Sequence, residues 1–503
     1  MTAKKSLQPL DRTALTLMLV LALLICILVW SGDRTLPRVR NFTWQNKQVG
    51  VEDTFFTLTF SRPMDEASVE ASLQIEPHLP GKISWAGRRT TYTLTAPVAY
   101  GTSYKVRLEG ATDRFRSDGH SQKGKLIEPF TGEFSTRDRA FAYVGVSAQE
   151  KGRLILYNLT QNKKTILTPK SLVVGDFKPY PQGDRILFSA ADWSSNAPGL
   201  FEQQLYSVTT GMPPQSNDRP WGTAKGNRAD VSQEPAGTIE RVLDNRDYQN
   251  LKFDLFPNGQ AIVVQRVNRD NLGEFGLWVV RTDSVPKPLN NQPGGDFLIT
   301  PDSETVAISH EEGVSILPLT PNAKPLDFLP EFAKVLSFAK DGSAAAMVKS
   351  NSDYTRSLFL VTNQGIEKEL LHTNGIIVDA KFAPLSTTIY CLYTQLKKEE
   401  QYQEKPYLVA IDLKTSQVKQ LLILPKKLDI QISLSPDGLA LIFDEVVTTS
   451  SLPTAESLTT NEGKEIASSR LWLLPLTPNT AKSTSQVQPK LLPLQGFHPR
   501  WLP

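Results

Sequence analysis

Cysteine, histidine and methionine are all scarce in this sequence. Among 503 residues there are two cysteines, five histidines and five methionines. The cysteines, Cys26 and Cys391, lie far apart in the chain, so a disulfide framework is excluded. An oxidising compartment is neither required nor excluded. Excess charge is small as well. The formal net charge of +3 excludes the strong basic field that is typical of nucleic-acid-binding proteins.

The motifs that mark common catalytic sites are also missing. The sequence contains no G-x-S-x-G nucleophile elbow, no Walker loop, no dinucleotide fingerprint and no H-E-x-x-H zinc motif. The histidines occur one per region without the spacing of metal ligands, at His78, His120, His310, His372 and His498. We therefore predict no catalytic, cofactor-binding or metal-binding residue, and no cofactor.

One long apolar run stands near the N-terminus. The stretch "TALTLMLVLALLICILVW" from Thr13 to Trp30 has eighteen residues without a charge, and three basic residues precede it. A helix needs roughly 20 apolar residues to cross a bilayer. We therefore predict a basic tail over residues 1–12 and a single-pass transmembrane anchor over residues 13–31, with the bulk of the chain extracytoplasmic, on the periplasmic or outer face. A cleaved signal peptide is the alternative, but the length of the run and the lack of a small-x-small site favour the anchor.

Residues 37–137 are predicted to form a β-sandwich. Apolar and polar residues alternate in "FFTLTFS" from Phe55, "TTYTLTA" from Thr90 and "SYKVRLEG" from Ser103, which is the period of half-buried strands. Proline, glycine and Asn/Asp clusters separate these strands at short intervals, which indicates a sandwich of about 100 residues rather than an α/β unit. The segment "MDEASVEASL" from Met64 is expected to be a single helical turn or a short connection.

The same stretch resembles the bacterial Ig-like (SbsA-type) domains of surface and envelope proteins. The landmarks of that family stand at Phe60-Ser61-Arg62-Pro63-Met64-Asp65, Trp85, Leu94, Tyr100-Gly101-Thr102-Ser103-Tyr104, Asp113 and Phe134-Ser135-Thr136. The resemblance covers about a fifth of the chain and implies a spacer or adhesive module rather than a catalyst. Trp85 and Tyr104 could form a sugar-stacking platform. Packing in the sandwich core is the favoured interpretation, because large aromatic residues dominate such cores.

A strand–turn–strand phrase occurs six times in the rest of the chain, as in "LSPDGLALIFDE" from Leu434. Its turn positions are Gly183, Gly259, Ser303, Gly342, Ser386 and Gly438. Once a Pro/Gly/Asn-rich insertion at about 212–246 is set aside, the phrases recur at about forty residues, the period of a four-stranded propeller blade. A third strand and usually a fourth follow each phrase. Residues 139–503 are therefore predicted to form a β-propeller, with a second insertion at 446–469.

The two ends of this region complement each other. Residues from Ala140 onward supply a blade without its first strand, and the chain finishes with "FHPRWLP", in which Pro503 aligns with Pro436 of an "SPDG" turn. The C-terminal strand can therefore complete the first blade and close the ring, with seven blades as the favoured number. This part resembles TolB-type or WD-like propellers, whose blades carry the same turn, and the resemblance concerns fold rather than function. The predicted class is all-β: a transmembrane helix, an Ig-like β-sandwich and a β-propeller.

Few residues qualify as a functional site. Asp341 and Asp437 precede turn glycines and could be metal-binding or catalytic carboxylates, but turn chemistry alone explains their position. His498 and Trp501 lie on the closing strand, where packing and closure are the favoured roles. Two long loops, "QLKKEEQYQEKP" from Gln395 and the second insertion, could bind a partner or be passive surface.

The favoured function is non-catalytic: a membrane-anchored envelope protein whose propeller acts as a protein-interaction scaffold or assembly subunit. Its predicted partners are proteins at the membrane or envelope, and the membrane itself through residues 13–31; nucleic acid is not one of them. One alternative is a binder of cell-wall glycan or polysaccharide, which requires exposed aromatic residues along a groove. Another is an enzyme that uses the central channel, such as a lyase, lactonase or glycosidase. That alternative requires carboxylates, histidines or a metal converging at one mouth of the ring.

Overall fold

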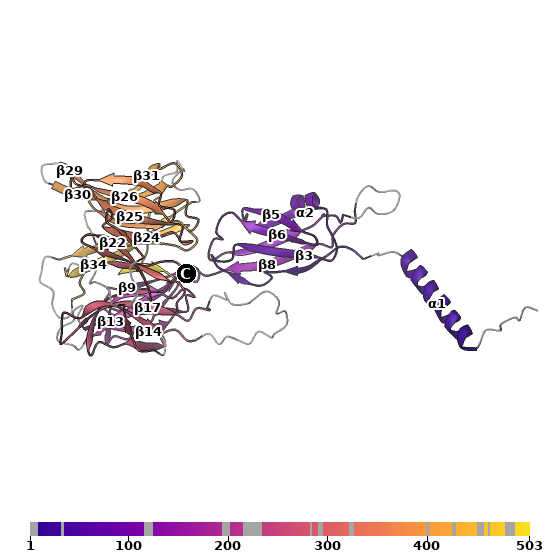
Figure 1. Cartoon of the computed structure of the whole chain (residues 1–503), viewed down its shortest axis with the longest axis horizontal. Helices are drawn as coiled ribbons and strands as arrows, with labels where there is room; N and C mark the ends of the chain where they lie inside the picture. The colour runs from indigo at the N-terminus through magenta and orange to yellow at the C-terminus, as the bar shows by residue number, and fades with distance from the viewer. Residues whose placement is uncertain are drawn as a thin grey trace, which may run out of the picture. The chain divides into compact units, whose positions relative to one another are not determined.

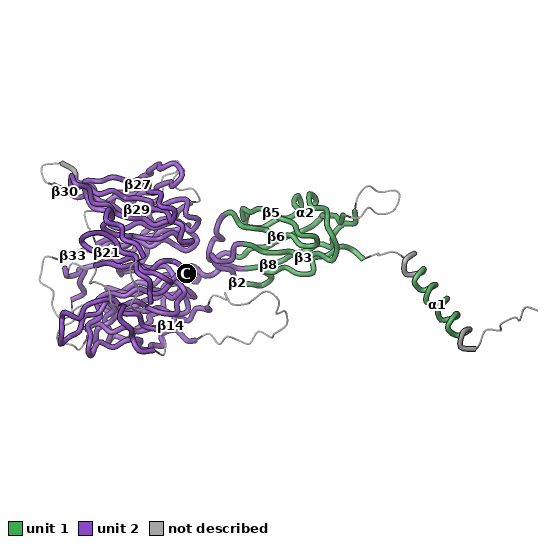
Figure 2. Tube along the Cα trace, in the orientation of Figure 1, with its two compact units in different colours: residues 1–47, 55–95, 103–134 green, residues 48–54, 96–102, 135–503 purple. Residues whose placement is uncertain are grey.

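A computed structural model describes most of the chain. The described residues are 9–31, 35–114, 124–193, 202–214, 234–281, 284–289, 295–320, 326–398, 402–424, 429–449, 457–460, 463–477 and 488–503. The chain divides into two compact units. Unit 1 contains residues 1–47, 55–95 and 103–134, and unit 2 contains residues 48–54, 96–102 and 135–503 (Figure 2).

The first helix, α1 (Pro9–Ser31), contains the long apolar run. In the part of the chain that the structure describes, no helix is both long and apolar enough to span a membrane, which takes roughly 20 consecutive apolar residues. The prediction of a transmembrane anchor over residues 13–31 is therefore wrong. The membrane location and the extracytoplasmic placement were derived from that anchor, so they are withdrawn with it.

The predicted sandwich consists of two four-stranded sheets (Figure 1). One has the order β1–β3–β6–β5, with β1 (Val39–Phe42), β3 (Phe55–Phe60), β5 (Gly81–Ala86) and β6 (Arg89–Leu94). The other has the order β2–β8–β7–β4, with β2 (Gln48–Val49), β4 (Leu73–Glu76), β7 (Ser103–Leu108) and β8 (Phe130–Thr136). Every second residue of β7 is buried, as the two-residue period predicted. The helix α2 (Glu66–Ser72) is longer than the single turn expected there, and Asp65 caps it by accepting the Ser68 N–H.

Aromatic side chains fill the space between these two sheets. The ring of Tyr104 stacks on Phe134 with centroids 5.0 Å apart. Trp44 packs against Phe134 at 4.9 Å and against Phe56 at 5.2 Å. All four side chains are buried. Tyr104 is therefore a core residue, as favoured from the sequence, and its ring is not available to stack on a sugar.

Seven four-stranded antiparallel sheets make up the described part of residues 140–503 (Figure 1). In six of them the strand order follows the chain, and the first two sheets contain β12 (Leu172–Pro179), β13 (Arg185–Asp192), β14 (Gln204–Thr209) and β15 (Ile239–Leu243), and then β16 (Tyr248–Leu255), β17 (Ala261–Asn268), β18 (Phe275–Arg281) and β19 (Lys287–Pro288). The next two contain β20 (Phe297–Ile299), β21 (Thr305–His310), β22 (Gly313–Pro318) and β23 (Asp327–Leu329), and then β24 (Lys334–Phe338), β25 (Ala344–Ser350), β26 (Arg356–Thr362) and β27 (Glu367–Thr373). The last two contain β28 (Ile377–Phe382), β29 (Thr388–Lys398), β30 (Tyr402–Asp412) and β31 (Val418–Ile423), and then β32 (Ile432–Leu434), β33 (Ala440–Thr448), β34 (Ile466–Pro475) and β35 (Lys490–Leu491). The seventh has the order β11–β10–β9–β36, with β9 (Ala140–Gly145), β10 (Leu154–Asn158), β11 (Lys163–Ile166) and β36 (Gly496–Trp501). We name β12, β16, β20, β24, β28, β32 and β36 the inner strands.

Each of the six repeated phrases forms an inner strand, a tight turn and the second strand of a sheet. All six turn positions have a left-handed backbone, with φ between 51° and 73°, including Ser303 and Ser386. Glycine adopts this conformation without steric penalty, which explains its use at the other four positions. In four turns the preceding Asn or Asp side chain accepts the N–H group two residues further on, at Asn258, Asp302, Asp341 and Asp437. These hydrogen bonds confirm the predicted turn chemistry.

The C-terminal strand β36 pairs with β9, as the incomplete first repeat indicated. Gly496 lies opposite Gly145, and Trp501 lies opposite Phe141. The strand thereby becomes the fourth member of the sheet that contains β9, β10 and β11. Apolar clusters join neighbouring sheets, and one of them brings Leu154 of β10 together with Phe188 of β13. The core of unit 2 therefore consists of side chains packed between successive sheets.

Strands enter both of the predicted insertions. β15, the fourth strand of its sheet, lies within 212–246, whereas residues 215–233 lie outside the described part of the chain. The strands β33 and β34 extend into 446–469, and residues 450–456 and 461–462 lie outside the described part. Both insertions are thus shorter than the sequence suggested, because an outer strand or a long hairpin occupies part of each.

Candidate functional site

Charged side chains recur at one register on the inner strands. Positions seven and five residues before the turn residue hold Asp176 and Lys178 on β12, Lys252 and Asp254 on β16, and Asp379 and Lys381 on β28. Residues two apart on a regular strand lie on the same face, so the pairs on β16 and β28 each point to one side of their sheet, whereas Asp176 lies in a β-bulge of β12. The sequence carries this signal as the triplets "DFK", "KFD" and "DAK" before a turn. The pattern cannot be recognised from the sequence alone, because each triplet by itself is an ordinary strand pattern.

Ion pairs connect these side chains from one inner strand to the next. Arg500 Nη2 on β36 lies 2.8 Å from Asp176 Oδ1 on β12. Lys178 Nζ, two residues further along β12, lies 2.7 Å from Asp254 Oδ1 on β16. Burial by itself raises the pKa of Asp176, but the neighbouring charges of Arg500 and Lys178 lower it below its usual value. Asp176 is therefore ionised at neutral pH and holds β36 against β12.

The chain of ion pairs continues to β24 through a shared carboxylate. Lys252 Nζ on β16 lies 2.6 Å from Asp296 Oδ1, and Lys334 on β24 pairs with the other oxygen of the same carboxylate. Burial opposes ionisation of Asp296, yet the two lysines lower its pKa to about 2. Charge pairs thus connect the four inner strands β36, β12, β16 and β24, the last two through Asp296, which directly precedes β20. Networks of this kind orient their members more firmly than isolated surface pairs do.

A cavity of about 520 Å³ lies among the inner strands, and we name it the central cavity. β12, β24, β28, β32 and β36 all contribute to its wall. The charged side chains on that wall are Lys178, Lys334, Lys381, Arg500, Asp379 and Asp429. Four cations therefore face two carboxylates. Lys381 pairs with Asp379 on its own strand, with 3.1 Å between the nitrogen and the oxygen.

A second cavity, of about 560 Å³, lies on the side of the repeated turns. Its wall includes the turn prolines Pro257, Pro384 and Pro436, together with Val51 and Glu52 of unit 2. Five residues line both cavities: Lys178, Pro179, Lys381, Ser433 and Trp501. The two cavities therefore meet at a waist formed by two lysines, a proline, a serine and a tryptophan.

A buried carboxylate joins the inner strands β32 and β36. Asp444 on β33 is fully buried and accepts the backbone N–H groups of Gln431, at 2.7 Å, and of His498, at 2.8 Å. Burial raises the pKa of Asp444 to about 7, although the two hydrogen bonds act in the opposite direction. Its two oxygens therefore position the backbone next to both strands, and the side chain has no access to solvent.

His498 has an unusual backbone conformation and an unusual ring environment. Its φ of 53° lies in the left-handed region, which is uncommon for a residue other than glycine. The side chain is 8% exposed, and burial lowers its pKa to about 4, so the ring is neutral at pH 7. Within the described residues, its Nδ1 atom has no hydrogen-bond partner. Packing alone, the role favoured from the sequence, does not explain these features.

The stability of unit 2 is expected to depend on pH through Asp444 and His498, with opposite signs. The folded pKa of Asp444, about 7, lies above its unfolded value of about 4, so stability is lost as the pH rises from about 4 to 7. The folded pKa of His498, about 4, lies below its unfolded value of about 6.5, so stability is gained as the pH rises from about 4 to 6.5. The two contributions therefore cancel over most of this window.

Removal of the imidazole should expose the contribution of Asp444. The variant His498→Asn keeps the backbone N–H that Asp444 accepts, and asparagine tolerates a positive φ. We expect its free energy of unfolding to fall, relative to the wild type, by about 1.4 kcal/mol per pH unit between pH 4.5 and 6.5. Urea unfolding midpoints at three pH values measure this difference, with His372→Asn as a control for loss of an exposed imidazole. If the free energy of unfolding varied with pH in the same way for His498→Asn and the wild type, the opposing contributions of Asp444 and His498 would be contradicted.

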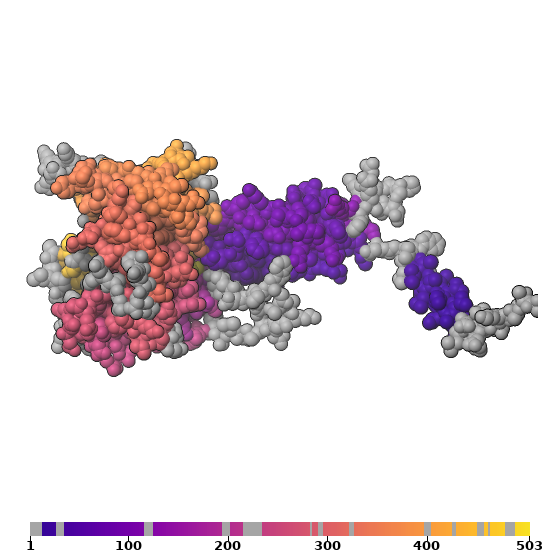
Figure 3. Space-filling view, in the orientation of Figure 1, coloured from indigo at the N-terminus to yellow at the C-terminus, as the bar shows by residue number. Residues whose placement is uncertain are grey.

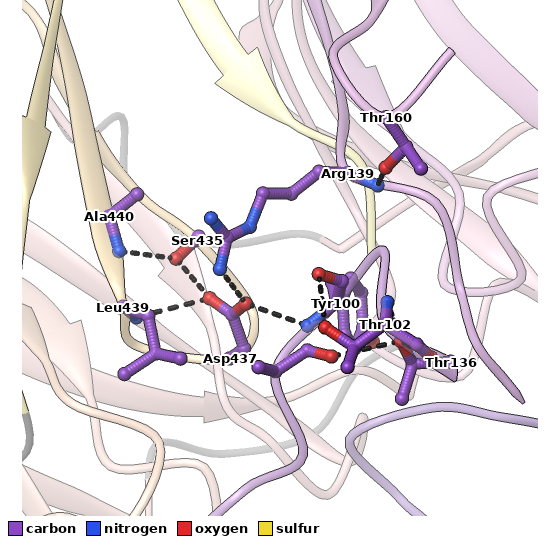
Figure 4. Close-up of polar contacts among 10 residues, drawn as sticks. Tyr100, Thr102, Thr136, Arg139, Thr160, Ser435, Asp437, Leu439 and Ala440 are labelled. Carbon is purple, nitrogen blue, oxygen red and sulfur yellow. Dashed lines mark hydrogen bonds and ion pairs between the residues drawn. The ribbon is translucent and has the colours of Figure 1, made fainter. Parts of the chain in front are cut away.

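Asp437 is the centre of a second buried polar cluster in unit 2 (Figure 4). Its Oδ2 atom accepts the backbone N–H of Tyr100 at 3.0 Å and Nη2 of Arg139 at 2.8 Å. Its Oδ1 atom accepts Oγ of Ser435 at 2.5 Å and the N–H of Leu439 at 3.0 Å. The carboxylate is completely buried. It therefore binds two other segments of unit 2 in addition to shaping its own turn.

Asp341 occupies the equivalent turn position and makes the turn contacts only. It is exposed, and its carboxylate accepts the N–H of Ser343 at 3.1 Å and the hydroxyl of Ser343 at 2.7 Å. These hydrogen bonds lower the pKa of Asp341. Turn chemistry is thus a sufficient explanation for Asp341 and an incomplete one for Asp437. Asp437 differs from Asp341 in being buried and in binding Tyr100 and Arg139. Within the turn, Asp437 accepts the hydroxyl of Ser435 before it, whereas Asp341 accepts that of Ser343 after it.

Arg137 fastens the C-terminal residue close to the same cluster. Its guanidinium donates to the carbonyl oxygens of Pro503 at 2.8 Å, Gln182 at 2.8 Å and Pro213 at 2.9 Å. The residue is 4% exposed, and burial lowers the pKa of its guanidinium. One side chain therefore donates to backbone oxygens of three separate segments. The role of Arg137 cannot be recognised from the sequence, because a lone arginine carries no local signal.

The other candidates from the sequence do not come together. His78 is exposed in unit 1, His310 is half-buried and His120 lies outside the described residues. The exposed His372 has Nδ1 3.1 Å from the hydroxyl of Ser357. Among the described residues, no group of three His, Cys, Asp or Glu side chains could hold a metal ion.

Trp85, the remaining aromatic candidate, is half-buried. Its ring stacks on Phe60 with centroids 6.1 Å apart, and its indole N–H donates to Glu70 Oε1 at 3.1 Å. One face of the ring and its polar atom therefore already have protein partners. This arrangement agrees with the packing role rather than with a sugar platform.

Comparison with known proteins gives a family match for the first region. Residues 33–136 match the model of the bacterial Ig-like domain. No curated protein matches the sequence. The match covers the sandwich and agrees with the resemblance drawn from its residues.

Solved structures similar to this chain include TolB-like propeller proteins. TolB from Acinetobacter baumannii is 12% identical, with 71% of this chain and 80% of that chain covered and a TM-score of 0.39. Oligogalacturonate lyase from Vibrio parahaemolyticus is 11% identical, with 69% and 92% covered and a TM-score of 0.45. Hydrazine synthase from Kuenenia stuttgartiensis is 12% identical, with 59% and 75% covered and a TM-score of 0.37. At this distance the comparison describes an all-β fold and assigns no activity.

Proposed function

We propose that the chain is a non-catalytic protein-interaction scaffold built on a closed seven-bladed propeller. The observation that carries the proposal is a β-ribbon formed by β29 and β30, which have eleven residues each (Figure 1, upper left). The two strands pair as far as Lys398 opposite Tyr402, whereas β28 accompanies β29 only to Tyr393. Beyond that point no third strand is described beside the ribbon. On the side of β29, Leu396 bonds the side chain of Asn374 through both its N–H and its carbonyl oxygen, so a strand or loop of a partner would pair with the ribbon beyond Leu396.

The two neighbouring sheets present hairpins at the same connection, between their second and third strands. β33 and β34 pair out to Thr448 and Ile466, past the last pairing with β32 at Phe443. In the sheet β24–β27, Tyr354 is 91% exposed and has a φ of 66°. Tyrosine is enriched at protein interfaces, because its ring is large and rigid. The region that carries β24 to β31 forms the orange surface of unit 2 in Figure 3.

The closed ring would hold these hairpins in fixed positions. The proposal of seven blades rests on the seven described sheets, each of four strands, and on the pairing of β36 with β9. It also rests on the ion pairs that run between neighbouring inner strands, from Arg500 on β36 to Lys334 on β24. A closed ring leaves no free sheet edge at the point where the chain ends meet.

The central cavity supports a binding role better than a catalytic one. Lys178, Lys381 and Arg500 each already hold a carboxylate. Asp444 has a pKa suited to a general base, but its side chain is fully buried and both oxygens accept backbone N–H groups. A general base must reach the proton that it removes, and Asp444 cannot do so. Glycan binding is not proposed, because Tyr104 is buried and the ring of Trp85 is packed.

Shortening the ribbon tests the proposed function. In the test variant, residues 396–404 are replaced by Asn-Gly, which forms a two-residue hairpin turn between Gln395 and Lys405. Tagged wild type and variant are used to capture partners from a lysate of the native organism, and captured proteins are quantified by mass spectrometry. We expect a stoichiometric protein partner on the wild type and at least a tenfold loss on the variant.

The control is Leu272→Ser in the loop between β17 and β18, the equivalent connection of another sheet, where Leu272 is 71% exposed. This variant should retain the partner. Circular dichroism and melting temperature establish that all three proteins are folded. If no stoichiometric partner is captured by the wild type, the scaffold function is abandoned. If the shortened variant keeps the partner, the ribbon is not its binding site.

A further inference from the structure

The side chain of Arg266 on β17 is buried and has no carboxylate partner. It is 5% exposed, and burial lowers the pKa of its guanidinium, which nevertheless stays charged at neutral pH. Within the described residues, the guanidinium makes one hydrogen bond, from Nε to Asn250 Oδ1 at 3.1 Å. Its central carbon lies 4.6 Å from the ring centroid of Tyr248 and 5.3 Å from that of Trp278. Asn250 and the two rings therefore fix the guanidinium and leave its two terminal nitrogens unbonded.

The equivalent cation of another sheet does have a carboxylate partner. Lys349 on β25 and Arg266 on β17 each stand seven residues after the turn residue of their repeat. In both sheets the residue two positions earlier lies opposite an aromatic residue of the third strand, Phe359 and Trp278 respectively. Lys349 lies 5.8 Å from the ring of Phe359 and pairs with Glu331. Because a buried charge is costly without a counter-charge, a carboxylate from a ligand would complete Arg266 as Glu331 completes Lys349.

Arg266 lines a groove of about 960 Å³ whose wall comes from the sheets β12–β15 and β16–β19, and we name it the side groove. Neither terminal nitrogen of Arg266 is among the buried atoms without a partner, so both keep accessible surface. Tyr248 and Trp278 line the groove as well, and Val285, which is 79% exposed, belongs to its border. Arginine, tyrosine and tryptophan packed together inside a more exposed border are typical of the centre of a protein-binding surface.

The charges of the side groove leave a small positive excess. The arginines that line it are Arg185, Arg241, Arg266 and Arg281. The carboxylates are Glu240, Asp244 and Asp247. Ion pairs occupy Arg185, Glu240 and Asp244, and the partners outside the groove are Glu234 and Arg246. With these two partners included, five arginines stand against four carboxylates. In the part of the chain that the structure describes, no ion pair involves Arg241, Arg266 or Arg281, so these three can bind carboxylates of a ligand.

The outer strand β15 gives the side groove a backbone edge. Four consecutive residues of β15, 240–243, line the groove. Consecutive strand residues point to opposite faces of a sheet, so the groove follows the edge of β15 rather than one face. β15 is the last strand of its sheet, and no other described strand pairs with its second edge. Asn250 Nδ2 binds the carbonyl oxygen of Asp244 at 3.0 Å, so the edge that an extended segment could use ends at Leu243.

We propose that the side groove binds an extended acidic segment of a partner protein, which pairs with the edge of β15 and places one carboxylate on the guanidinium of Arg266. The two terminal nitrogens of Arg266 can donate parallel hydrogen bonds to the two oxygens of that carboxylate. Acidic residues on either side of it would meet Arg241 and Arg281, and an apolar residue would cover Val285. The inference rests on the proposed scaffold function and adds a second surface to it, because no residue of β29 or β30 lines the side groove.

Selection of peptides on the immobilised full chain tests this inference. One library consists of capped heptapeptides with glutamate at the centre and random residues elsewhere, and the matched library has glutamine at the centre. Retained peptides are identified by mass spectrometry, and their dissociation constants are measured by fluorescence polarisation. We expect the glutamate library to yield peptides that bind one saturable site per chain, and the glutamine library to yield none. Higher salt should weaken the binding, because the attraction is partly electrostatic.

Two matched variants locate the selected peptides. Arg266→Met removes the charge and keeps an apolar side chain between the rings, and Lys349→Met makes the same change at the equivalent position of another sheet. We expect the first variant to weaken binding by roughly tenfold or more, the loss typical of an interface hot spot, and the second to leave it unchanged. Melting temperatures establish that both are folded. If Arg266→Met does not fold, Arg281→Gln at an exposed position of the groove replaces it, with an expected loss of about twofold or more.

Three results would overturn the inference. The first is that neither library yields a peptide with saturable binding. The second is equal recovery from the two libraries, which shows that the central carboxylate is not recognised. The third is unchanged binding of the selected peptides by the groove variant, which places them elsewhere on the chain. A chain that captures a partner through the ribbon but fails these tests keeps the scaffold function and loses only the side groove as a binding surface.

Discussion

Asp437→Ala is expected to destabilise unit 2 by about 3–5 kcal/mol, whereas Asp341→Ala is expected to lower its stability by about 1 kcal/mol or less. The two residues stand at the same position of the repeated turn, and each accepts the N–H two residues further on. Asp437 also pairs with Arg139 at 2.8 Å and accepts the Tyr100 N–H, and its carboxylate is completely buried. Alanine would leave a partly buried guanidinium and a buried N–H without their acceptor, which accounts for the larger loss.

The midpoints of guanidinium-induced unfolding, followed by far-ultraviolet circular dichroism, measure both losses. The variants Asp437→Ala and Asp341→Ala are matched in residue type, turn position and substitution, so intrinsic turn propensity cancels between them. Asp437→Asn, which keeps one oxygen for the turn but loses the charge, should fall between the wild type and Asp437→Ala. Equal shifts for Asp437→Ala and Asp341→Ala would show that the buried ion pair contributes nothing beyond the turn.

Deletion of residues 496–503 is expected to have the largest effect of all, with unit 2 failing to fold cooperatively. The deleted segment contains β36, which pairs with β9, and it buries the side chains of Phe497, Trp501 and Leu502. Truncation of a single large buried side chain costs about 2–5 kcal/mol, so three together amount to about 10 kcal/mol. This is comparable with the whole stability of a typical domain, about 5–15 kcal/mol. Loss of the ion pair between Arg500 and Asp176 adds to the effect.

Limited proteolysis and the melting curve of the truncated chain measure this loss. A synthetic peptide that corresponds to residues 494–503, added in excess, should restore protease resistance by occupying the vacant edge of β9. The matched control is Leu491→Ser on the outer strand β35, where the side chain is 52% exposed and little change is expected. A truncated chain that melts like the wild type would contradict the role of β36 in stabilising unit 2.

The sequence predicted the repeats well because their signals are local. A left-handed turn position, an Asn or Asp before it and alternating apolar residues on both sides recur within about a dozen residues. The six turns therefore lie where the sequence placed them, even where Ser303 and Ser386 replace glycine. The sandwich could be predicted equally well, since its strands β3, β7 and β8 alternate between buried and more exposed residues. The apolar run at the N-terminus was interpreted wrongly, because composition over a short window does not by itself establish a membrane span.

Much less of the candidate site could be predicted from the sequence. The triplets "DFK", "KFD" and "DAK" have no special meaning until seven inner strands are placed side by side. Only then do the lysines of one strand meet the carboxylates of the next, as Lys178 meets Asp254 across 76 residues. The neutral state of His498 and the raised pKa of Asp444 are likewise consequences of burial. Burial depends on the whole fold and cannot be read from neighbouring residues.

The sequence by itself determined the all-β class, the sandwich, the six turns and the strand that joins the two ends of the propeller region. Turn geometry and strand alternation depend on a few adjacent residues, so they are written directly in the chain. The tertiary structure alone decided that Asp437, and not Asp341, holds Tyr100 and Arg139, and that four cations face one cavity. Charge–charge and hydrogen-bond interactions act over a few ångströms in space. Tyr100 and Asp437 are 337 residues apart in the sequence, and only folding brings them within that distance.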